Sequence, residues 1–431
     1  MKTDANVVIL SVLQKNTIFV PLSNVKTTLT KVTMDPNTKK NRPGSFHLGL
    51  LPRIIIAIAL GIGAGYILPL AIVRIFVTFN ELFSQFLNFI IPLIIVGLVA
   101  PAIAEIGTKA GKMLIVTVLL AYASSLFSGF LAFGVGELTF PPLLKENMAL
   151  TSVISPEDIN PYFTIDIPSP FGVMTALVLA FLLGLGIAYS KADTMMEFFK
   201  EFRNIIEKTI KSVIIPVLPL YIFGIFLNMT HTGQVMNILS VFIKIIAVIF
   251  ILHIFLLILQ FSIAGVTVRK NPFKLLWRML PAYFTALGTQ SSAATIPVTM
   301  KQAVSNGVKE EIAGFTIPLC ATIHLSGSTL KIICCALALM MLQGLPYDFQ
   351  MFAGFIFMLG ITMVAAPGVP GGAIMASLGI LSSMLGFGDN DLALMIALYI
   401  AMDSFGTACN VTGDGAIALI VDKLFGKKDN E

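Results

Sequence analysis

Two carboxylates, Asp403 and Asp414, lie close together in an apolar stretch near the end of the chain. Ionisable groups are costly in a bilayer, so they normally face a protein cavity or a water-filled path. At about 100° per residue, positions 403, 407, 410 and 414 fall within about 60° of one another on a helix. The two carboxylates, the Thr407 hydroxyl and the Asn410 amide would then form one polar stripe. Such a stripe suits a cation or an ammonium group that leaves water part-way across a membrane.

The composition indicates a membrane protein. Of the 431 residues, 56% are hydrophobic and 12% are charged, whereas a soluble domain carries about 25% charged residues. Several apolar runs reach or approach the ~20 residues that a helix needs to span a bilayer. They are 54–73, 82–104, 113–134, 171–189, 212–229, 237–266, 329–343, 351–366 and 391–402. The net charge of +5 does not indicate nucleic-acid binding, because the basic residues lie in loops beside these runs.

Charge asymmetry between loops predicts the topology, since loops rich in Lys and Arg stay in the cytoplasm. The basic segments 1–53, 191–211 and 269–278 are therefore expected inside, with both termini, and the acidic segment 135–167 outside. Residues 1–47 are polar and basic without an early apolar core, which excludes a cleavable signal peptide. We interpret them as a disordered cytoplasmic leader, with a start site assigned too early as the alternative. Residues 426–431 would form a cytoplasmic tail.

Two further segments, 279–300 and 352–385, are apolar but broken. The first contains TQSSAATIP and the second contains PGVPGG. Small polar residues with proline, or glycine with proline, end helices and release backbone groups. In a membrane such groups survive only where they are buried or face water. Each segment is therefore predicted to be a hairpin of two half-helices that enters and leaves on one side.

Each predicted hairpin is followed by a span with its own predicted break, at 324–328 and at 410–414. Two units of hairpin and broken helix, one entering from each side, indicate an inverted repeat. In such a repeat the substrate site lies at the midplane, where the units meet.

Across roughly residues 50–425 the chain resembles the dicarboxylate/amino acid:cation symporters, a family that includes glutamate and neutral amino acid transporters. The motifs are TQSSAATIPVT at 289–299, ATIHLSGST at 321–329, GVPG at 368–371 and DSFGTACNVTGD at 403–414. The resemblance implies an all-α polytopic membrane protein with eight transmembrane helices, two re-entrant hairpins and an elevator mechanism in a homotrimer. Within a transporter domain at 48–425, it places the scaffold at about 50–106 and 168–230, and the transport domain at about 110–135 and 236–425.

The same resemblance assigns the substrate site. Asp403 would take the substrate's amino group, and Ser292 with the backbone of the first hairpin would meet its α-carboxylate. Members that carry acidic substrates have an Arg where this chain has Gly406. Glycine cannot supply a charge-assisted fork, so a neutral amino acid is predicted, and the absent side chain would leave volume for a larger or apolar one. The predicted substrate-binding residues are Ser291, Ser292, Ser328, Gly368, Val369, Pro370, Asp403, Gly406, Thr407 and Asn410.

The cation sites depart from the family pattern. Asn410 and Asp414 match one sodium site, but the family's second carboxylate, in the break of span 7, is Ser326 here. The Asn and Met beside it are His324 and Leu325. A sodium ion with one carboxylate fewer is held less well. The predicted sodium ligands are Thr322, His324, Ser326, Asn410 and Asp414.

Lys331 lies five residues past Ser326, without a charged neighbour in sequence. An unpaired ammonium there would be costly, so it should pair with a carboxylate or lose its proton. Our hypothesis is that Lys331 replaces one sodium ion as a tethered cation, or that Lys331 and His324 carry protons. The alternatives are that His324 only packs by a hydrogen bond, and that Lys331 reaches a lipid headgroup or a structural carboxylate.

Other polar residues in the spans have plainer interpretations. His253 and Gln260 are expected to make hydrogen bonds between helices. Ser124 and Ser125 lie on a span that helps to build a sodium site in the family, but no role is assigned to them. The cysteines are expected to be buried thiols; they are Cys320, Cys334, Cys335 and Cys409.

The predicted function is secondary active transport in the plasma or inner membrane: symport of a neutral amino acid with Na⁺ or H⁺ or both, with no bound cofactor. One alternative is a transporter of the same fold for another small amine or a carboxylate, including a dicarboxylate or glutamate; a second is an ion channel. A membrane-embedded enzyme is not predicted, because the chain has no HExxH zinc pattern and no GxSxG elbow.

Overall fold

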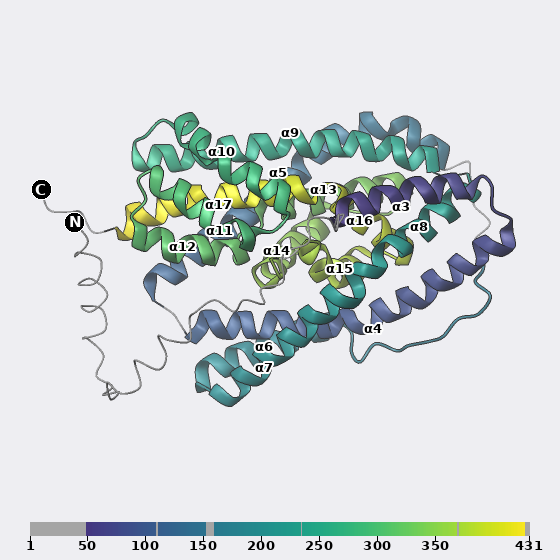
Figure 1. Cartoon of the computed structure of the whole chain (residues 1–431), viewed down its shortest axis with the longest axis horizontal. Helices are drawn as coiled ribbons and strands as arrows, with labels where there is room; N and C mark the ends of the chain where they lie inside the picture. Colours follow the sequence, from purple (N-terminus) through teal and green to yellow (C-terminus); the bar gives the residue numbers. More distant parts are fainter. Residues whose placement is uncertain (1–48, 109–110, 152–158, 234, 369, 427–431) are drawn as a thin grey trace, which may run out of the picture. The chain divides into compact units, whose positions relative to one another are not determined.

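The computed structural model describes residues 49–426 except for 109–110, 152–158, 234 and 369. The predicted leader at 1–47, Val369 and the tail beyond residue 426 lie outside the described residues. Within the described part, every regular element is a helix (Figure 1). Helices satisfy their backbone hydrogen bonds internally, as hydrocarbon surroundings demand. The predicted all-α class is confirmed.

The helices keep the labels of Figure 1. In chain order they are α3 Leu50–Gly65, α4 Leu70–Thr108, α5 Lys112–Thr151, α6 Val173–Ser190, α7 Asp193–Thr209, the π-helix η1 Ile210–Ile214, α8 Ile215–His231, α9 Val235–Val268, α10 Pro272–Thr289, α11 Ser292–Ser305, α12 Glu310–Ile323, α13 Ser326–Gln343, α14 Phe349–Ala365, α15 Gly372–Leu385, α16 Asp389–Ala401 and α17 Asp403–Phe425.

Within the described residues, five helical stretches are long and apolar enough to cross a bilayer, and α16 with α17 makes a sixth that is bent by 62°. The five stretches are Leu70–Glu105, Lys112–Lys145, Asp193–His231, Ile238–Val268 and Glu310–Gln343. Shorter apolar helices, among them α3, α14 and α15, complete the set. Length and hydropathy thus support a polytopic membrane protein, whereas the count of eight full spans stays a prediction.

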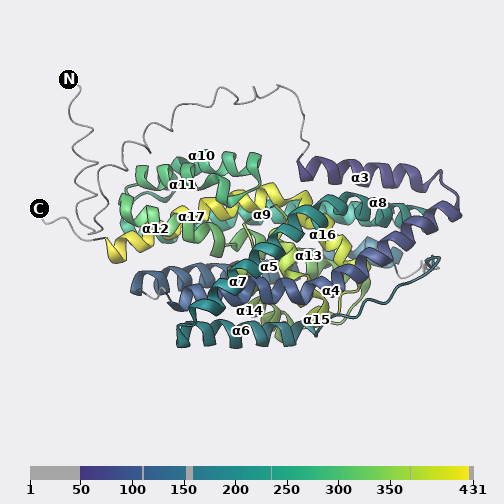
Figure 2. The ribbon, with the colours of Figure 1, turned by 60° about the horizontal axis from the view of Figure 1, so that its bottom comes forward.

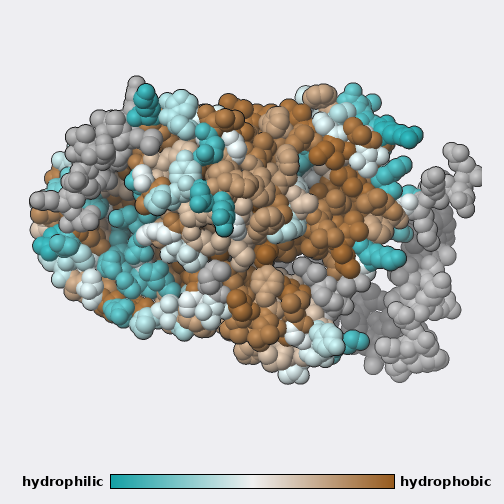
Figure 3. All heavy atoms as spheres, turned by 180° about the vertical axis from the view of Figure 1, so that it is seen from behind, coloured by the Kyte–Doolittle hydropathy of each residue, from teal (hydrophilic) through white to brown (hydrophobic). Residues whose placement is uncertain are grey.

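The surface matches that class. Figure 3 shows one face with a broad band of apolar side chains, and hydrophilic side chains gather toward both of its ends. Leu138, Val266 and Trp277 are among the large apolar side chains left exposed. In water such a band would be a liability, whereas against lipid chains it carries no cost.

Glycines lie where some helices approach one another closely. α3 packs against α8, and α4 packs against α6 (Figures 1 and 2). A Cβ on Gly61 of α3 would lie 2.7 Å from the carbonyl oxygen of Phe223, and one on Gly184 of α6 would lie 2.8 Å from that of Ala100. Small residues let membrane helices approach to backbone contact. The predicted division into scaffold and transport domains remains untested by these contacts.

Three element boundaries differ from the sequence prediction. The first predicted run, 54–73, contains the end of α3 and the start of α4, because Pro69 between them lacks an amide hydrogen to continue a helix. The predicted loop 191–211 is largely α7, which continues through η1 into α8. Its buried Met196 and Phe199 lie on one face, so it is an amphipathic helix. The first part of 135–167 likewise continues α5.

Both predicted hairpins have the helix–break–helix form. α10 and α11 are joined at Gln290 and Ser291, where Gln290 adopts a φ of +53°. The Ser291 hydroxyl accepts a hydrogen bond from the Ala294 amide and so caps α11. α14 and α15 are joined by the segment that ends at Gly371, whose φ of +73° suits glycine.

One predicted helix break is confirmed and the other is wrong. α12 and α13 are separated by His324 and Leu325, inside the predicted 324–328 break. In the last span, α17 runs without interruption through 410–414, and the bend falls at Met402. Gly413 does not break the helix. Its lack of a side chain leaves room for the neighbouring helices, since a Cβ there would lie 2.6 Å from Gln260 Oε1.

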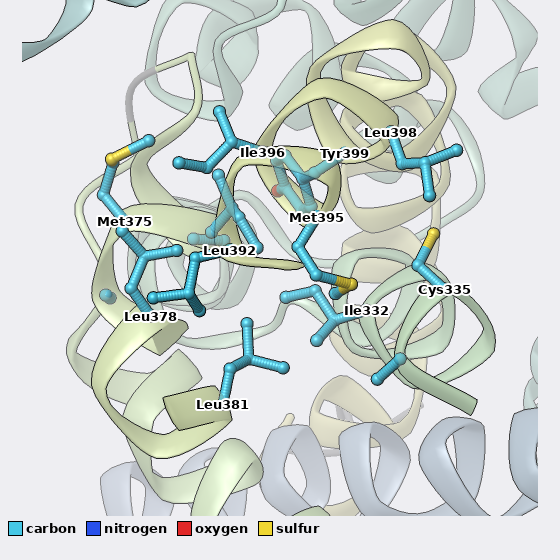
Figure 4. Packing of buried hydrophobic residues seen from close by; sticks show 14 of the residues in the cluster. Ile332, Cys335, Met375, Leu378, Leu381, Leu392, Met395, Ile396, Leu398 and Tyr399 are labelled. Atoms are coloured by element: carbon cyan, nitrogen blue, oxygen red, sulfur yellow. The ribbon is translucent and has the colours of Figure 1, made fainter. Parts of the chain in front are cut away.

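The core centres on α13. Every residue from Ser326 to Leu342 is buried, and α13 packs against α5, α9, α16 and α17. Figure 4 shows Ile332 and Cys335 of α13 beside Met395 and Leu398 of α16. A polar side chain on α13 therefore has only protein groups around it, which makes the surroundings of Lys331 decisive.

Candidate functional site

Lys331 and Asp403 form a buried ion pair between α13 and the first residue of α17. The Lys331 ammonium lies 3.1 Å from Asp403 Oδ1, and the two side chains are 0% and 4% exposed. The ammonium also donates to the Tyr399 carbonyl oxygen at 3.3 Å and lies 3.3 Å from the centroid of the Tyr399 ring. A buried charge needs this kind of compensation. The structure thus supplies the partner that the sequence could not specify.

The second oxygen of Asp403 holds the tip of the second hairpin. Asp403 Oδ2 accepts a hydrogen bond from the Gly371 amide at 2.9 Å. Gly371 immediately precedes α15, so the carboxylate also faces the N-terminal end of a helix, which favours negative charge. One carboxylate therefore joins three elements: α17, α13 and the hairpin.

The space beside Gly406 is filled by the Lys331 side chain. A Cβ added to Gly406 would lie 2.9 Å from Lys331 Nζ and 3.0 Å from Lys331 Cε. The prediction that Gly406 leaves room for a larger substrate side chain is therefore wrong. Glycine fits here because a lysine on the neighbouring helix takes the volume of a side chain at 406.

Asn410 caps the start of α13. Its Oδ1 accepts hydrogen bonds from the amides of Gly327 at 2.8 Å and Ser328 at 3.3 Å, which satisfies amides that a helix start leaves without partners. Asn410 Nδ2 donates to Ser328 Oγ at 3.0 Å, and that hydroxyl also lies 3.0 Å from the Tyr399 hydroxyl. The helix break is thus fixed by side chains of α16 and α17.

A second buried polar cluster surrounds Asp414. His324 Nδ1 lies 2.9 Å from Asp414 Oδ1, with both side chains at most 1% exposed, and His324 Nε2 lies 3.0 Å from Ser124 Oγ. Gln260 Nε2 donates to Ser124 Oγ at 3.0 Å and to Ser326 Oγ at 3.1 Å. This cluster draws on α5, α9, α13, α17 and the break before α13.

The predicted sodium ligands do not all meet. His324, Ser326 and Asp414 belong to the cluster just described, whereas Asn410 serves the cap of α13. Thr322 is exposed, and its hydroxyl donates to the Leu319 carbonyl oxygen of its own helix at 2.8 Å. Thr322 lies in the last turn of α12, and this hydrogen bond stays within that helix.

The two hairpin tips meet beside the start of α17. Ser291 Oγ donates to the Gly368 carbonyl oxygen at 3.3 Å, and Gln290 Nε2 donates to Ser404 Oγ at 2.9 Å. α11 and α15 both begin at these tips, and the free amides of helix N-termini attract anions. Of the remaining predicted substrate residues, Ser292 and Thr407 are buried, Pro370 lies at the second tip, and Val369 lies outside the described residues.

A cavity of about 230 Å³ borders the second hairpin. Thr322, Pro367 and Gly368 line one wall, and Arg203 lines another. Arg203 forms an ion pair with Glu105 at 2.9 Å. The second hairpin thus lines this cavity with Pro367 and Gly368, while its Gly371 contacts Asp403.

Some site residues were not identified from the sequence. Tyr399 contacts Lys331 and Ser328, yet only its position four residues before Asp403 could have pointed to it. The expected hydrogen bonds between helices are present: Gln260 makes those described above, and His253 Nε2 lies 3.0 Å from the Gly327 carbonyl oxygen. All four cysteines are free and buried, as predicted.

Two helical hairpins whose tips meet beside two interrupted spans, with buried charges at the interruptions, are an architecture typical of membrane transporters. The chain belongs to the sodium:dicarboxylate symporter family, which it matches over residues 50–424. Members of this family are elevator-type transporters, and the family resemblance drawn from the motifs is confirmed.

Two similar proteins narrow the comparison. A serine/threonine transporter of Acinetobacter baumannii is 28% identical over 393 residues, covering 87% of this chain and 97% of that protein. A serine/threonine transporter of Streptococcus agalactiae is 28% identical over 399 residues, covering 88% of this chain and 97% of that protein.

Proposed function

We propose that this chain is a secondary active transporter that carries a small neutral amino acid, of the serine and threonine class, in symport with Na⁺ or H⁺ or both. The similar proteins that carry serine and threonine support the substrate class. An elevator movement in a homotrimer, with both termini in the cytoplasm, completes the proposal.

The Lys331–Asp403 pair is the observation that carries this proposal. The pair has no net charge, and a zwitterionic amino acid adds none. A dicarboxylate or glutamate would bring one more negative charge, and Gly406 offers no group to balance it. Because unbalanced charge in a desolvated site is strongly disfavoured, the alternative acidic substrates are not favoured.

The amino acid is placed by its three parts. Its ammonium would bind Asp403, and its α-carboxylate would face the helix starts at the hairpin tips, near Ser291, Ser292 and Gly368. Its side chain would point toward Gly406, where the volume is already limited by Lys331. This limit is consistent with a side chain as small as that of serine or threonine. Ser328, Val369, Pro370, Thr407 and Asn410 would complete the site.

The coupling ion belongs with the cluster around Asp414. For Na⁺, we propose oxygen ligands from Ser326 and Asp414, with Asn410 holding the start of α13 and Thr322 serving beside the second hairpin. For H⁺, His324 is the proposed carrier, since its imidazole contacts both Asp414 and Ser124. Lys331 pairs with Asp403, and Asp414 pairs with His324, so the tethered charge of Lys331 would act at the amine site and not at the cation site.

Purified protein in liposomes tests the proposal. Labelled L-serine, L-threonine and L-glutamate are offered under a sodium gradient, a pH gradient, both and neither. Accumulation of serine or threonine above the outside concentration is expected, with glutamate at background. Thermal stabilisation by the same amino acids, with and without sodium, gives an independent measure, because a ligand that binds only the folded state raises stability. Preference for glutamate, or downhill flux alone as in a channel, would refute the proposal.

A further inference from the structure

A symporter must also return across the membrane without its cargo. In that step, a carboxylate that binds the cargo's ammonium would be buried without an opposite charge. Removing one partner of a buried ion pair is strongly destabilising because it leaves an uncompensated charge. The return of the unloaded carrier therefore needs a counterion for Asp403.

Lys331 meets this need with groups of the chain alone. Its ammonium lies on Asp403 Oδ1, the oxygen that does not bind the hairpin, while Gly371 donates to Oδ2. Both hydrogen bonds can exist together, so pairing with Lys331 is compatible with a second hairpin held against Asp403. The Lys331–Asp403 pair and the Gly371–Asp403 hydrogen bond are present together in this structure.

Lys331 also has a place to remain when another ammonium approaches Asp403. The Tyr399 carbonyl oxygen and the Tyr399 ring both contact Lys331 Nζ at 3.3 Å, and aromatic faces attract cations. Gly406 leaves the side chain free of steric conflict. A small shift of the ammonium from Oδ1 toward Tyr399 would free that oxygen without exposing the lysine charge.

We propose that Lys331 is an internal counterion that takes the place of the substrate's ammonium on Asp403 and so permits the unloaded carrier to close and return. This inference rests on the proposed function, because it takes Asp403 as the amine site. In the transport cycle, substrate ammonium and Lys331 alternate on Asp403 Oδ1. Lys331 therefore pairs with Asp403 in the half of the cycle in which the carrier returns without substrate.

Net uptake and exchange are two measurements that distinguish the unloaded step of the transport cycle from the loaded step. Net uptake into empty liposomes requires the unloaded carrier to return, whereas exchange of external labelled serine for internal serine uses the loaded carrier in both directions. In the Lys331→Met variant, the substrate's ammonium can still pair with Asp403 during exchange, but the loaded site carries one more negative charge than in the unmodified protein, so exchange should fall too, though less than net uptake. The unloaded form keeps only the Gly371 hydrogen bond to that carboxylate.

The experiment compares unmodified protein, Lys331→Met and the matched control Lys301→Met, which makes the same change at an exposed lysine. Radiolabelled L-serine is the probe, with empty and serine-loaded liposomes. For Lys331→Met, the ratio of net uptake to exchange is expected to fall at least about tenfold, because a shift of about 1.4 kcal/mol in a barrier changes a rate tenfold. The control should keep the ratio of the unmodified protein.

The results distinguish the two proposals. If unmodified protein neither takes up nor exchanges serine or threonine, the proposed function fails, whatever the variants do. If the unmodified protein transports and Lys331→Met keeps the same ratio, or loses both activities in parallel while monodisperse, the counterion role is overturned.

A second variant covers the case in which Lys331→Met does not fold. In Gly406→Ala the lysine is retained, but the added Cβ would lie 2.9 Å from Nζ and must displace the ammonium. The ratio of net uptake to exchange should fall in this variant too, to a smaller degree. An unchanged ratio in a folded Gly406→Ala protein would overturn the inference by itself.

Discussion

At the scale of single residues, Lys331 determines both the free volume and the charge balance of the candidate site. Lys331 occupies the space that a side chain at 406 would need, and its ammonium neutralises Asp403. The two positions are therefore coupled: glycine at 406 is compatible with lysine at 331, and a larger residue at 406 is not. In the proposed function, the same pair limits both the size and the charge of the substrate.

The pair predicts strong coupling in stability. Lys331→Met alone should lower the free energy of unfolding by about 3–5 kcal/mol, because it leaves a buried carboxylate unpaired. The double variant Lys331→Met with Asp403→Leu should recover most of this loss, since an apolar pair replaces the ionic one. Denaturant unfolding in detergent measures both. Additive losses in the double variant would show that the two residues do not act as a pair.

Moving the positive charge should move the specificity. In Lys331→Met combined with Gly406→Arg, the arginine can take the vacated volume and present a fork to a second carboxylate. Uptake of L-aspartate is expected to rise above that of the unmodified protein, while L-serine uptake falls. Gly406→Arg alone is the control, and it should be inactive because Lys331 still fills the space. Failure of the double variant to take up aspartate, in folded protein, would contradict this.

At the scale of elements, side chains of neighbouring helices stabilise the helix interruptions. Asn410 caps α13 across the gap between helices, and Gly413 lets α17 approach Gln260 and His324. The sequence predicted a break in α17 at 410–414, but the helix is continuous there, and Gly413 allows close packing instead of forming a turn.

Gly413→Ala tests that packing. The added Cβ would lie 2.6 Å from Gln260 Oε1 and 2.8 Å from His324 Cε1, and overpacking of this kind costs about 1–3 kcal/mol. Gly186→Ala is the matched control, since nothing lies within 4 Å of its added Cβ, and it should be neutral or stabilising by about 0.4–1 kcal/mol. Thermal unfolding compares the two. Equal melting temperatures would show that α17 does not depend on Gly413.

At the scale of the molecule, the two hairpins come from separate parts of the chain, and their tips meet at the site. Ser291 of the first hairpin contacts Gly368 of the second across 77 positions of sequence. Movement of one tip relative to the other would break this contact, so we propose that the tips control access to Asp403.

A reversible cross-link between the tips should block transport. Cysteines at Ser291 and Gly368 are expected to form a disulfide under oxidant, since the Ser291 hydroxyl already reaches the Gly368 carbonyl oxygen. Serine exchange should fall on oxidation and return with dithiothreitol. Each single cysteine variant serves as a control and should be insensitive to oxidant. Full exchange activity in the oxidised, cross-linked protein would show that the tips need not separate.

The sequence by itself determined the membrane class, the helical content, both hairpins and the break at His324, because each depends on local composition or helix termination. It also identified Asp403, Asp414 and Lys331 as the costly groups. The tertiary structure decided which charges meet: Lys331 and Asp403 are 72 positions apart on different helices. It also placed the bend at Met402 and filled the volume beside Gly406. These outcomes depend on packing between segments that are distant in the chain, and such packing cannot be predicted from local patterns in the sequence.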